Sequence, residues 1–307
     1  MNTDALRKRL LLSFLISCIS IPATVVSSDE STMPGHEDYE AEILDWRKRR
    51  QERLTSTSGY LAQVGLEWLE EGLNRIGQQD SSNVRIHGGP DDWGTIIVSG
   101  QQLKFVPNPD ADIQVDGSPA TEVVLIADNQ GEPTIVRSGN LSFYVIYRAS
   151  YAVRVKDTKS PDLLAFTGVD NYQAQESWRI NGNFILAPKG QTIEIANILG
   201  QLENSPVYGA FEFERDGKSH SLIALGEESS PSLWFLFADK TSGRETYGAG
   251  RYLYSEGMPE DGRLIVDFNK AYNPPCAFNE FSTCPLTPQE NRLRMAVRAG
   301  EKKYHHD

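Results

Sequence analysis

From Gly59 onward the apolar residues fall in short runs, rich in β-branched and aromatic side chains, that are separated by Gly, Asn, Asp and Pro. Segments such as GTIIVSG, LSFYVIYR and YAVRVKD have the length and composition of β-strands. The pairs Asp116-Gly117, Asp216-Gly217 and Asp261-Gly262 suit tight turns, because glycine accepts a positive φ at little cost. No long helical pattern interrupts these runs. The sequence therefore predicts an all-β fold of two antiparallel blocks, each resembling a sandwich or a barrel.

The two blocks are predicted at residues 63–175 and 176–307, with a softer stretch before the second block. The first block opens with an ambiguous segment, GLEWLEEGLNRIG. Its leucines recur at helical spacing, whereas Gly72 and Asn74 permit a strand, a turn and a second strand. We expect a β-hairpin here.

Helices are expected only at the two ends of the mature chain. Within the N-terminal segment, residues 29–62, the stretch HEDYEAEILDWRKRRQERL is charged except for a narrow apolar stripe formed by Ile43, Trp46 and Leu54. This pattern predicts a helix that docks on a larger body. At the other end, PQENRLRMAVRAGEKKY predicts a short helix that Thr287 caps before Pro288.

Residues 1–28 have the pattern of an export signal, with the cationic run Arg7–Arg9 followed by a short apolar run that Pro22 breaks. This pattern favours a signal peptide over an uncleaved membrane anchor. The mature protein is therefore expected in the periplasm or cell envelope. Within the signal, LISC resembles the lipobox of bacterial lipoproteins, whose cysteine, here Cys18, is lipidated. Cleavage near Ser28 is the alternative. Contact with the membrane is expected only through such a lipid anchor.

The charge of the chain excludes one class of partner. The 307 residues carry a net charge of −12, and residues 1–28 contribute +2 because Asp4 stands against three basic residues, so the mature chain carries −14. Such a field repels phosphate backbones, and no basic patch with interleaved aromatic residues offsets it. We expect no nucleic-acid partner.

Cys276 and Cys284 lie eight positions apart in a stretch rich in proline and asparagine. A disulfide, half of a metal site and a reactive thiol are the three alternatives. Zinc needs four converging ligands, which here would have to include the terminal pair His305 and His306. Export to an oxidising compartment favours a disulfide over free thiols, and we expect the two Cα atoms within about 7 Å of each other.

The sequence contains no H-E-x-x-H, G-x-S-x-G or phosphate-cradling glycine motif, and no cofactor is expected. Polar residues in apolar or turn contexts cluster near the C-terminus. Arg251 and Asp267 suit either a structural ion pair or part of a ligand pocket. The residues of this candidate pocket are Arg251, Tyr252, Asp267, Asn269, Tyr272, Asn291 and Arg292.

A second candidate site lies in the first block, where RASYAVRVKD carries Arg148, Arg154 and Lys156. Strand alternation places Arg154 and Lys156 on one face. A solvated sheet face is the ordinary interpretation of such a pattern, and an anion-binding face is the alternative.

Several of these segments resemble a known family. FADKTSGRETYGAGRYLY and DFNKAYNPPCAFNEFSTCPLTPQENRLRMAVRAGEKKY look like the C-terminal signature of the family catalogued as domain of unknown function 1684. That resemblance implies a prokaryotic protein and carries no established activity. NRIGQQDSSNVRI is faintly similar to the opening of a forkhead-associated sandwich. Gln78 stands where that family expects an arginine, so this likeness implies the fold and not phosphopeptide binding.

The missing catalytic signatures favour a non-enzymatic binding or interaction module of the cell envelope, with a small molecule or an envelope protein as its partner. The alternative is a hydrolase of unrecognised type that uses a pocket around Asp267, Arg251 and Tyr272, with Tyr252 nearby. A carboxylate with a raised pKa beside a nucleophile would favour the enzyme. A saturated Arg–Asp pair would favour the module.

Overall fold

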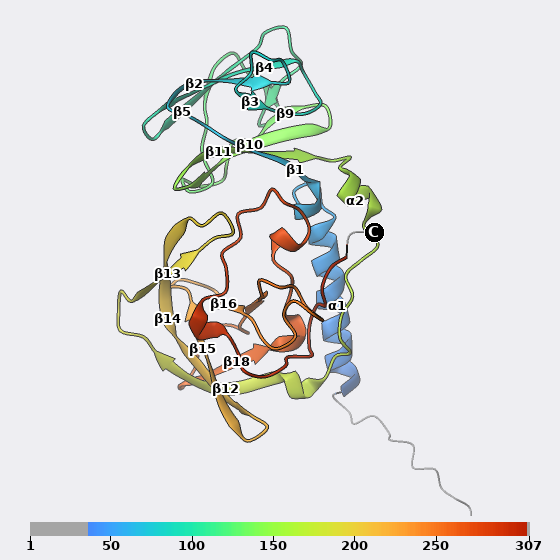
Figure 1. The fold of residues 1–307 in the computed structure, drawn as a ribbon, viewed down its shortest axis with the longest axis vertical. Coiled ribbons are helices and arrows are strands. Elements are labelled where there is room, and N and C mark those ends of the chain that lie inside the picture. The colour runs from blue at the N-terminus through green and yellow to red at the C-terminus, as the bar shows by residue number, and fades with distance from the viewer. Residues whose placement is uncertain (1–35, 306–307) are drawn as a thin grey trace, which may run out of the picture.

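The computed structural model describes residues 36–305 of the chain. The predicted export signal, including Cys18, lies outside these residues. Two β blocks lie one above the other in Figure 1, with helix α1 (His36–Leu54) beside the second block and its C-terminal end directed toward the first. None of the helices in residues 36–305 is long and apolar enough to span a membrane.

The first block is a sandwich of two sheets. A six-stranded sheet has the order β1-β11-β10-β9-β6-β7, and a five-stranded sheet has the order β3-β2-β4-β5-β8. Trp93, Phe105 and Phe143 are fully buried in its core. The strands are β1 (Gln63–Trp68), β2 (Gly72–Gly77), β3 (Val84–Arg85), β4 (Asp92–Ser99), β5 (Gln102–Pro107), β6 (Gln114–Val115), β7 (Ser118–Pro119), β8 (Val123–Val124), β9 (Val136–Ser138), β10 (Leu141–Arg148) and β11 (Ser150–Asp157).

The predicted hairpin at the start of this block is wrong in its pairing. The segment does form a strand, a turn and a strand, but β1 pairs with β11 in one sheet and β2 pairs with β4 in the other. The Asn74 side chain accepts a hydrogen bond from Glu70 N and donates one to Glu70 O, which closes the turn locally. Leu69 is buried between the sheets. The turn is therefore a corner that carries the chain from one sheet to the other.

The second block is a curved sheet with the order β17-β16-β15-β14-β12-β18, and β13 pairs with β14. Its two outer strands approach each other through a bridge between Ser255 and Val266, so the sheet is barrel-like. Four phenylalanines, Phe211, Phe235, Phe237 and Phe268, are fully buried inside it. The strands are β12 (Arg179–Leu186), β13 (Thr192–Ala196), β14 (Leu202–Arg215), β15 (Lys218–Leu225), β16 (Trp234–Phe237), β17 (Arg251–Tyr254) and β18 (Arg263–Asp267). The predicted all-β fold is confirmed.

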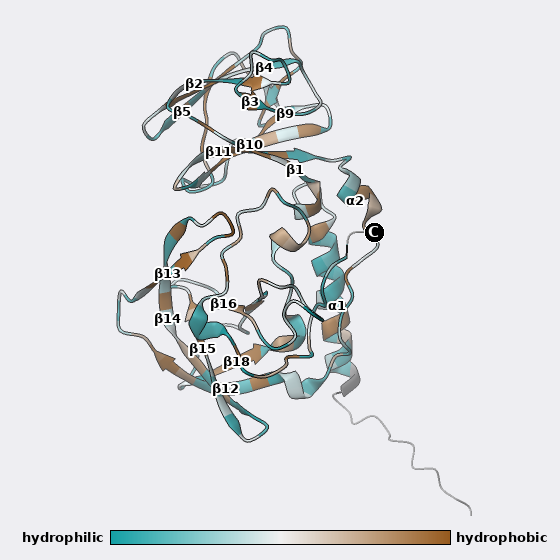
Figure 2. Cartoon of the chain, viewed as in Figure 1, coloured by the Kyte–Doolittle hydropathy of each residue, from teal (hydrophilic) through white to brown (hydrophobic). Residues whose placement is uncertain are grey.

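Most residues of helix α1 are hydrophilic (Figure 2), and the helix contacts the second block through polar pairs such as Arg50 with Glu301 and Glu42 with Lys270. Ile43 and Leu54, two members of the predicted apolar stripe, are fully buried. Between the blocks, residues 158–178 contain helix α2 (Pro161–Ala165) and the 3₁₀ turn Glu176–Trp178. This connection contacts α1, since Arg47 Nη2 donates to Tyr172 O at 2.8 Å.

The predicted C-terminal helix is wrong. Residues 288–304 contain only a 3₁₀ turn at Gln289–Asn291, and the rest is extended coil. Leu293, Val297 and Ala299 are buried in the core of the second block. Extended chain also lets carbonyl groups of alternate residues face one buried arginine, as described below, which a helix cannot do. Tertiary packing thus overrides the helical pattern.

Candidate functional site

A groove of about 700 Å³ lies between the C-terminal half of α1 and strand β17. This volume is within the range of small-molecule sites, roughly 300–1,000 Å³. Three parts of the chain line the groove: α1 with the turn after it, β17 with the two residues that follow, and Lys270 of the 3₁₀ turn Phe268–Lys270 with Tyr272, two residues later. Its lining residues are Trp46, Arg50, Arg53, Ser56, Ser58, Gly59, Tyr60, Tyr254, Ser255, Glu256, Lys270 and Tyr272.

One wall of the groove is aromatic. The rings of Tyr254 and Tyr272 are parallel to within 14°, with centroids 6.4 Å apart. Trp234, on the neighbouring strand β16, continues the row, with its ring 20° from that of Tyr254. Tyr254 is 48% exposed, so its ring is available to a ligand. Alternation along β17 explains the arrangement, because Tyr252 and Tyr254 are two residues apart and share a face.

A network of fixed charges forms the rim. Lys270 Nζ lies 2.6 Å from Glu42 Oε1 and 2.7 Å from Glu256 Oε1. Glu256 also accepts hydrogen bonds from Arg179, at 2.5 and 3.0 Å. Burial alone would raise the pKa of Glu256, but the hydrogen bonds from Arg179 and Lys270 outweigh burial and hold the pKa below its usual value. A general acid needs the opposite shift.

Two arginines of α1 complete the groove. Arg50 lies over the ring of Tyr272, 4.7 Å from its centroid, and pairs with buried Glu301 at 3.0 Å. Arg50 Nη2 also donates to Asn273 O. Arg53, one turn later, is exposed and forms no ion pair with any carboxylate in residues 36–305. Arg50 is therefore held in place by the protein, whereas Arg53 is available to a ligand.

Arg251, a predicted pocket residue, is fully engaged by the protein. Its Nη2 donates to Asp239 Oδ2 at 2.9 Å and to Val297 O at 2.8 Å. Its Nη1 donates to the carbonyl oxygens of Ala299 and Glu301. The predicted pairing of Arg251 with Asp267 is wrong, because Asp239 takes that place. The Arg251–Asp239 pair is buried, with side-chain exposures of 1% for Arg251 and 0% for Asp239.

Asp267 belongs to a different buried network, which fixes the first half of α1. Tyr39 OH lies 3.0 Å from both carboxylate oxygens of Asp267. Asn269 donates to Asp267 Oδ1 through its backbone and its side chain, both at 2.9 Å. Burial and the Asp267 charge raise the pKa of Tyr39, so the phenol stays a donor. Asp267 and Asn269 are thus saturated and lie outside the groove lining.

The other predicted pocket residues are also scattered. Tyr252 OH donates to Pro285 O at 2.7 Å, and the Asn291 side chain pairs with the backbone of Ile223. Arg292 is exposed. Among the seven predicted residues, Tyr272 alone lines the groove. The hydrolase pocket proposed around Asp267, Arg251 and Tyr272 is therefore not assembled as one site.

The groove residues that sequence reasoning missed lie mainly on α1 and in the turn after it. Arg50 and Arg53 lie in the basic run RKRRQER, which follows the acidic residues of the same helix and is typical of a solvated helical face. Trp46 belongs to the apolar stripe that predicts docking of the helix, a pattern that does not mark a ligand site. Tyr254 carried a signal that could have been used, since it recurs two residues after Tyr252 in an aromatic strand.

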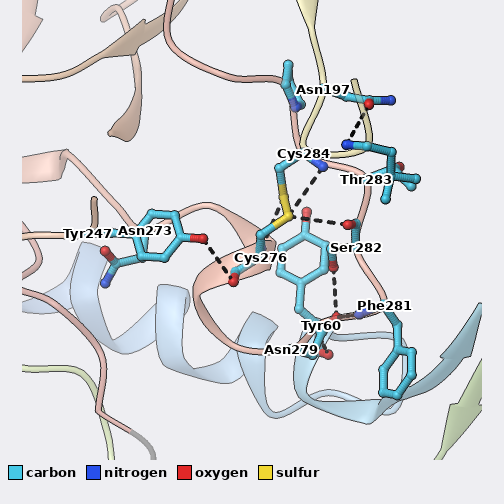
Figure 3. Close-up of a disulfide and its surroundings, with 12 residues drawn as sticks. Tyr60, Asn197, Tyr247, Asn273, Cys276, Asn279, Phe281, Ser282, Thr283 and Cys284 are labelled. Atoms are coloured by element: carbon cyan, nitrogen blue, oxygen red, sulfur yellow. Dashed lines mark hydrogen bonds between the residues drawn. A yellow bond between two sulfur atoms is a disulfide. The ribbon is translucent and has the colours of Figure 1, made fainter. Parts of the chain in front are cut away.

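The predicted disulfide is confirmed. Cys276 and Cys284 are bonded, with Cα atoms 6.1 Å apart (Figure 3). The bond closes a loop whose ends are held by the second block, since Tyr247 OH donates to Cys276 O and Ile198 N donates to Cys284 O. In residues 36–305 no group of three His, Cys, Asp or Glu side chains is placed to hold a metal ion.

The disulfide loop also connects the second block to the start of the first. Asn279 Nδ2 donates to Tyr60 O at 2.9 Å, and Ser282 Oγ lies 2.8 Å from Gln63 Oε1. Phe278 packs with Leu54 and other buried apolar side chains at the end of α1. Since Tyr60 lines the groove, the disulfide loop supports one of its walls.

The second predicted site, on the first block, is only partly assembled. Arg148 pairs with Asp128 at 2.9 Å and does not join the other cations. Arg154 and Lys156 do share one face of β11, and Arg154 is buried. Burial, together with the charge of Arg154, lowers the pKa of Lys156 to about 8. Two neighbouring cations are therefore partly removed from water at this position.

The lowered pKa of Lys156 predicts that the stability of the folded protein increases with pH above about pH 8. The unfolded chain keeps the Lys156 proton up to the ordinary lysine pKa, whereas the folded chain releases it near pH 8. Between these values the unfolded state binds more protons, so stability rises with pH. In chloride buffer, the stability difference between wild type and Lys156→Met should shift in favour of wild type from pH 7.5 to pH 9.5. Urea unfolding at both pH values measures it, and an unchanged difference would contradict the assignment.

Part of the chain is similar to a family of unknown function, and parts of it match solved structures. No curated protein sequence matches it. An uncharacterized protein from gene locus rrnAC0354 of Haloarcula marismortui, solved by NMR, is 28% identical over 45% of this chain and 77% of its own, with a TM-score of 0.38. A solved structure titled Rv0020c_FHA is 18% identical over 31% of this chain and 91% of its own, with a TM-score of 0.21. Residues 164–302 match the family model described as protein of unknown function, DUF1684, which confirms that resemblance for this part of the chain.

Proposed function

We propose that the protein is a non-catalytic binding module of the cell envelope and that its ligand occupies the groove between α1 and β17. The observation that carries this proposal is the aromatic wall. Tyr254 and Tyr272 present parallel rings beside fixed charges, in a hollow of about 700 Å³. Binding sites for small molecules combine apolar and aromatic walls with a few placed polar groups in this way.

The lining favours a polyhydroxylated ligand, such as a saccharide. The C–H face of a sugar ring packs on an aromatic ring, while its hydroxyl groups need donors and acceptors nearby. Tyr254 supplies an exposed ring, and Glu256, Arg53 and Ser58 supply acceptors and donors around it. These polar groups are of both signs, so a strongly charged ligand is less favoured than a neutral one with hydroxyl groups.

The state of the charged residues supports binding over catalysis. Glu256 is the carboxylate in the groove lining, and its two cationic partners keep its pKa low. The N–H groups of Arg251 donate to Asp239 and to backbone carbonyl oxygens. A saturated pair of this kind stabilises a fold and leaves nothing to polarise a substrate.

A thermal-shift screen tests the proposed groove. A ligand that binds only the folded state stabilises it by about 2.7 kcal/mol at a hundredfold excess over Kd. We expect a saccharide among sugars, peptides and nucleotides to raise the midpoint, and Tyr254→Ala to abolish the rise. Tyr147→Ala, which removes a 38% exposed tyrosine of the first block, should leave it intact. An equal rise in both variants would place the ligand elsewhere.

The envelope location rests on the sequence pattern of residues 1–28 and needs its own test. Mass spectrometry of the protein from its host should show either an N-terminus near Asp29 or a lipidated Cys18. Cytoplasmic protein that keeps an intact Met1 would contradict both forms of export.

A further inference from the structure

Two cations lie where the first block meets the disulfide loop. Arg154 and Lys156 are on β11, opposite Leu66 and Gln63 of β1. Arg154 is only 7% exposed, and its Nη2 reaches Thr283 Oγ1 of the disulfide loop at 3.2 Å. Lys156 is half-buried, lies 5.3 Å from the centroid of the Tyr144 ring and donates to Ser58 O.

Neither cation has an anionic partner among the residues that the structure describes. No carboxylate within residues 36–305 forms an ion pair with Arg154 or Lys156. Within the described part of the chain, Arg154 Nε is buried without a hydrogen-bond partner, and the one hydrogen bond of the guanidinium goes to a neutral hydroxyl. A buried cation without a counter-charge is costly, so proteins rarely keep one for structure alone.

The other arginines with comparable burial show how this chain ordinarily treats them. Arg50 is paired with Glu301 at 3.0 Å, and Arg251 is paired with Asp239 at 2.9 Å. On the same sheet, Arg148 is paired with Asp128. Arg154 is thus the exception among the buried arginines of the described chain, and a second cation stands next to it on the strand.

We propose that Arg154 and Lys156, with the Thr283 hydroxyl, bind a phosphate-like or sulfate-like oxyanion at the junction of the first block and the disulfide loop. The guanidinium fork offers several N–H donors, the ammonium group offers a point charge, and the hydroxyl offers one more donor. A bound oxyanion would supply the missing counter-charge. This site is separate from the groove and does not depend on its proposed ligand.

The test compares inorganic phosphate with chloride at equal ionic strength. Phosphate should raise the thermal midpoint of the wild type in a saturable way, by about 2–4 °C at a tenfold excess over Kd. Arg154→Met and Lys156→Met should each lose this response. Arg137→Met, which removes an exposed cation of the same block, should keep it. Glycerol 3-phosphate and sulfate, run in parallel, distinguish an esterified phosphate from a free ion.

Two results would overturn the site. One is a wild-type midpoint that is the same in phosphate, glycerol 3-phosphate, sulfate and chloride. The other is a response of equal size in Lys156→Met and in Arg137→Met, which would mean that the anions act on the protein generally. Lys156 is half-buried and at a strand end, so its variant decides the outcome even if Arg154→Met does not fold.

Discussion

Replacing Arg251 with Met is expected to lower the free energy of unfolding by about 3–5 kcal/mol, because removal of one partner leaves a buried charge uncompensated. The charge left behind is Asp239, whose side chain is 0% exposed. The loss extends beyond the ion pair, since the carbonyl oxygens of Val297, Ala299 and Glu301 lose the same donor. The C-terminal coil should then detach from the second block.

Urea unfolding measures this loss, with Arg263→Met as the matched control. Arg263 is exposed and bonds to Asn181 and Asn183, so its removal should change stability by well under 1 kcal/mol. The double variant Arg251→Met with Asp239→Leu removes both charges and should recover part of the stability. If the single and double variants were equally unstable, the ion pair would not be the source of the effect.

Replacing Cys276 with Ser should lower the stability by about 2–3 kcal/mol, the value that the chain-entropy model gives for a loop of this length. The two cysteines are eight positions apart, and the loop between them carries the contacts to Tyr60 and Gln63. Cys284→Ser should have the same effect. Loss of the loop should also weaken ligand binding in the groove, because Tyr60 forms part of its wall.

Reductant provides the control for this second prediction. It should lower the midpoint of the wild type to that of the Ser variants and should leave the double variant Cys276→Ser/Cys284→Ser unchanged. Full stability of the Ser variants, with both thiols of untreated wild type open to alkylation, would show that the bond does not form in solution. Destabilisation by a chelator in place of reductant would point to a metal instead.

The features that could be predicted from the sequence are those set by local pattern. Period-two runs cut by glycine and asparagine predicted antiparallel strands, and two cysteines in proline-rich coil predicted a disulfide. Ile43 and Leu54 identified the buried side of α1. In each case the residues that form the sequence pattern also form the structural feature, so the prediction did not depend on contacts between distant parts of the chain.

The candidate site could not be predicted because its residues meet only through tertiary packing. Arg50 of α1 lies over Tyr272, more than two hundred residues away in the chain. Asp267 was the predicted partner of Arg251, and nothing in strand alternation pointed to Asp239, which pairs with it instead. The C-terminal segment has a helical pattern, yet its carbonyl groups bind Arg251 from an extended chain. Contacts between residues far apart in the chain determine the groove, the partner of Arg251 and the extended C-terminal segment. The pattern of a single sequence does not reveal such contacts.

The most direct test of a binding module with its site between α1 and β17 is to follow the ligand itself. A compound identified in the thermal-shift screen is incubated with wild type and with Tyr254→Ala. The compound is then recovered, and its mass is measured by mass spectrometry. We expect wild type to bind it one to one and return it unchanged, and Tyr254→Ala not to bind it. Recovery of a cleaved or otherwise altered ligand from wild type, with the change absent from the variant, would contradict the non-catalytic role and make the groove an active site.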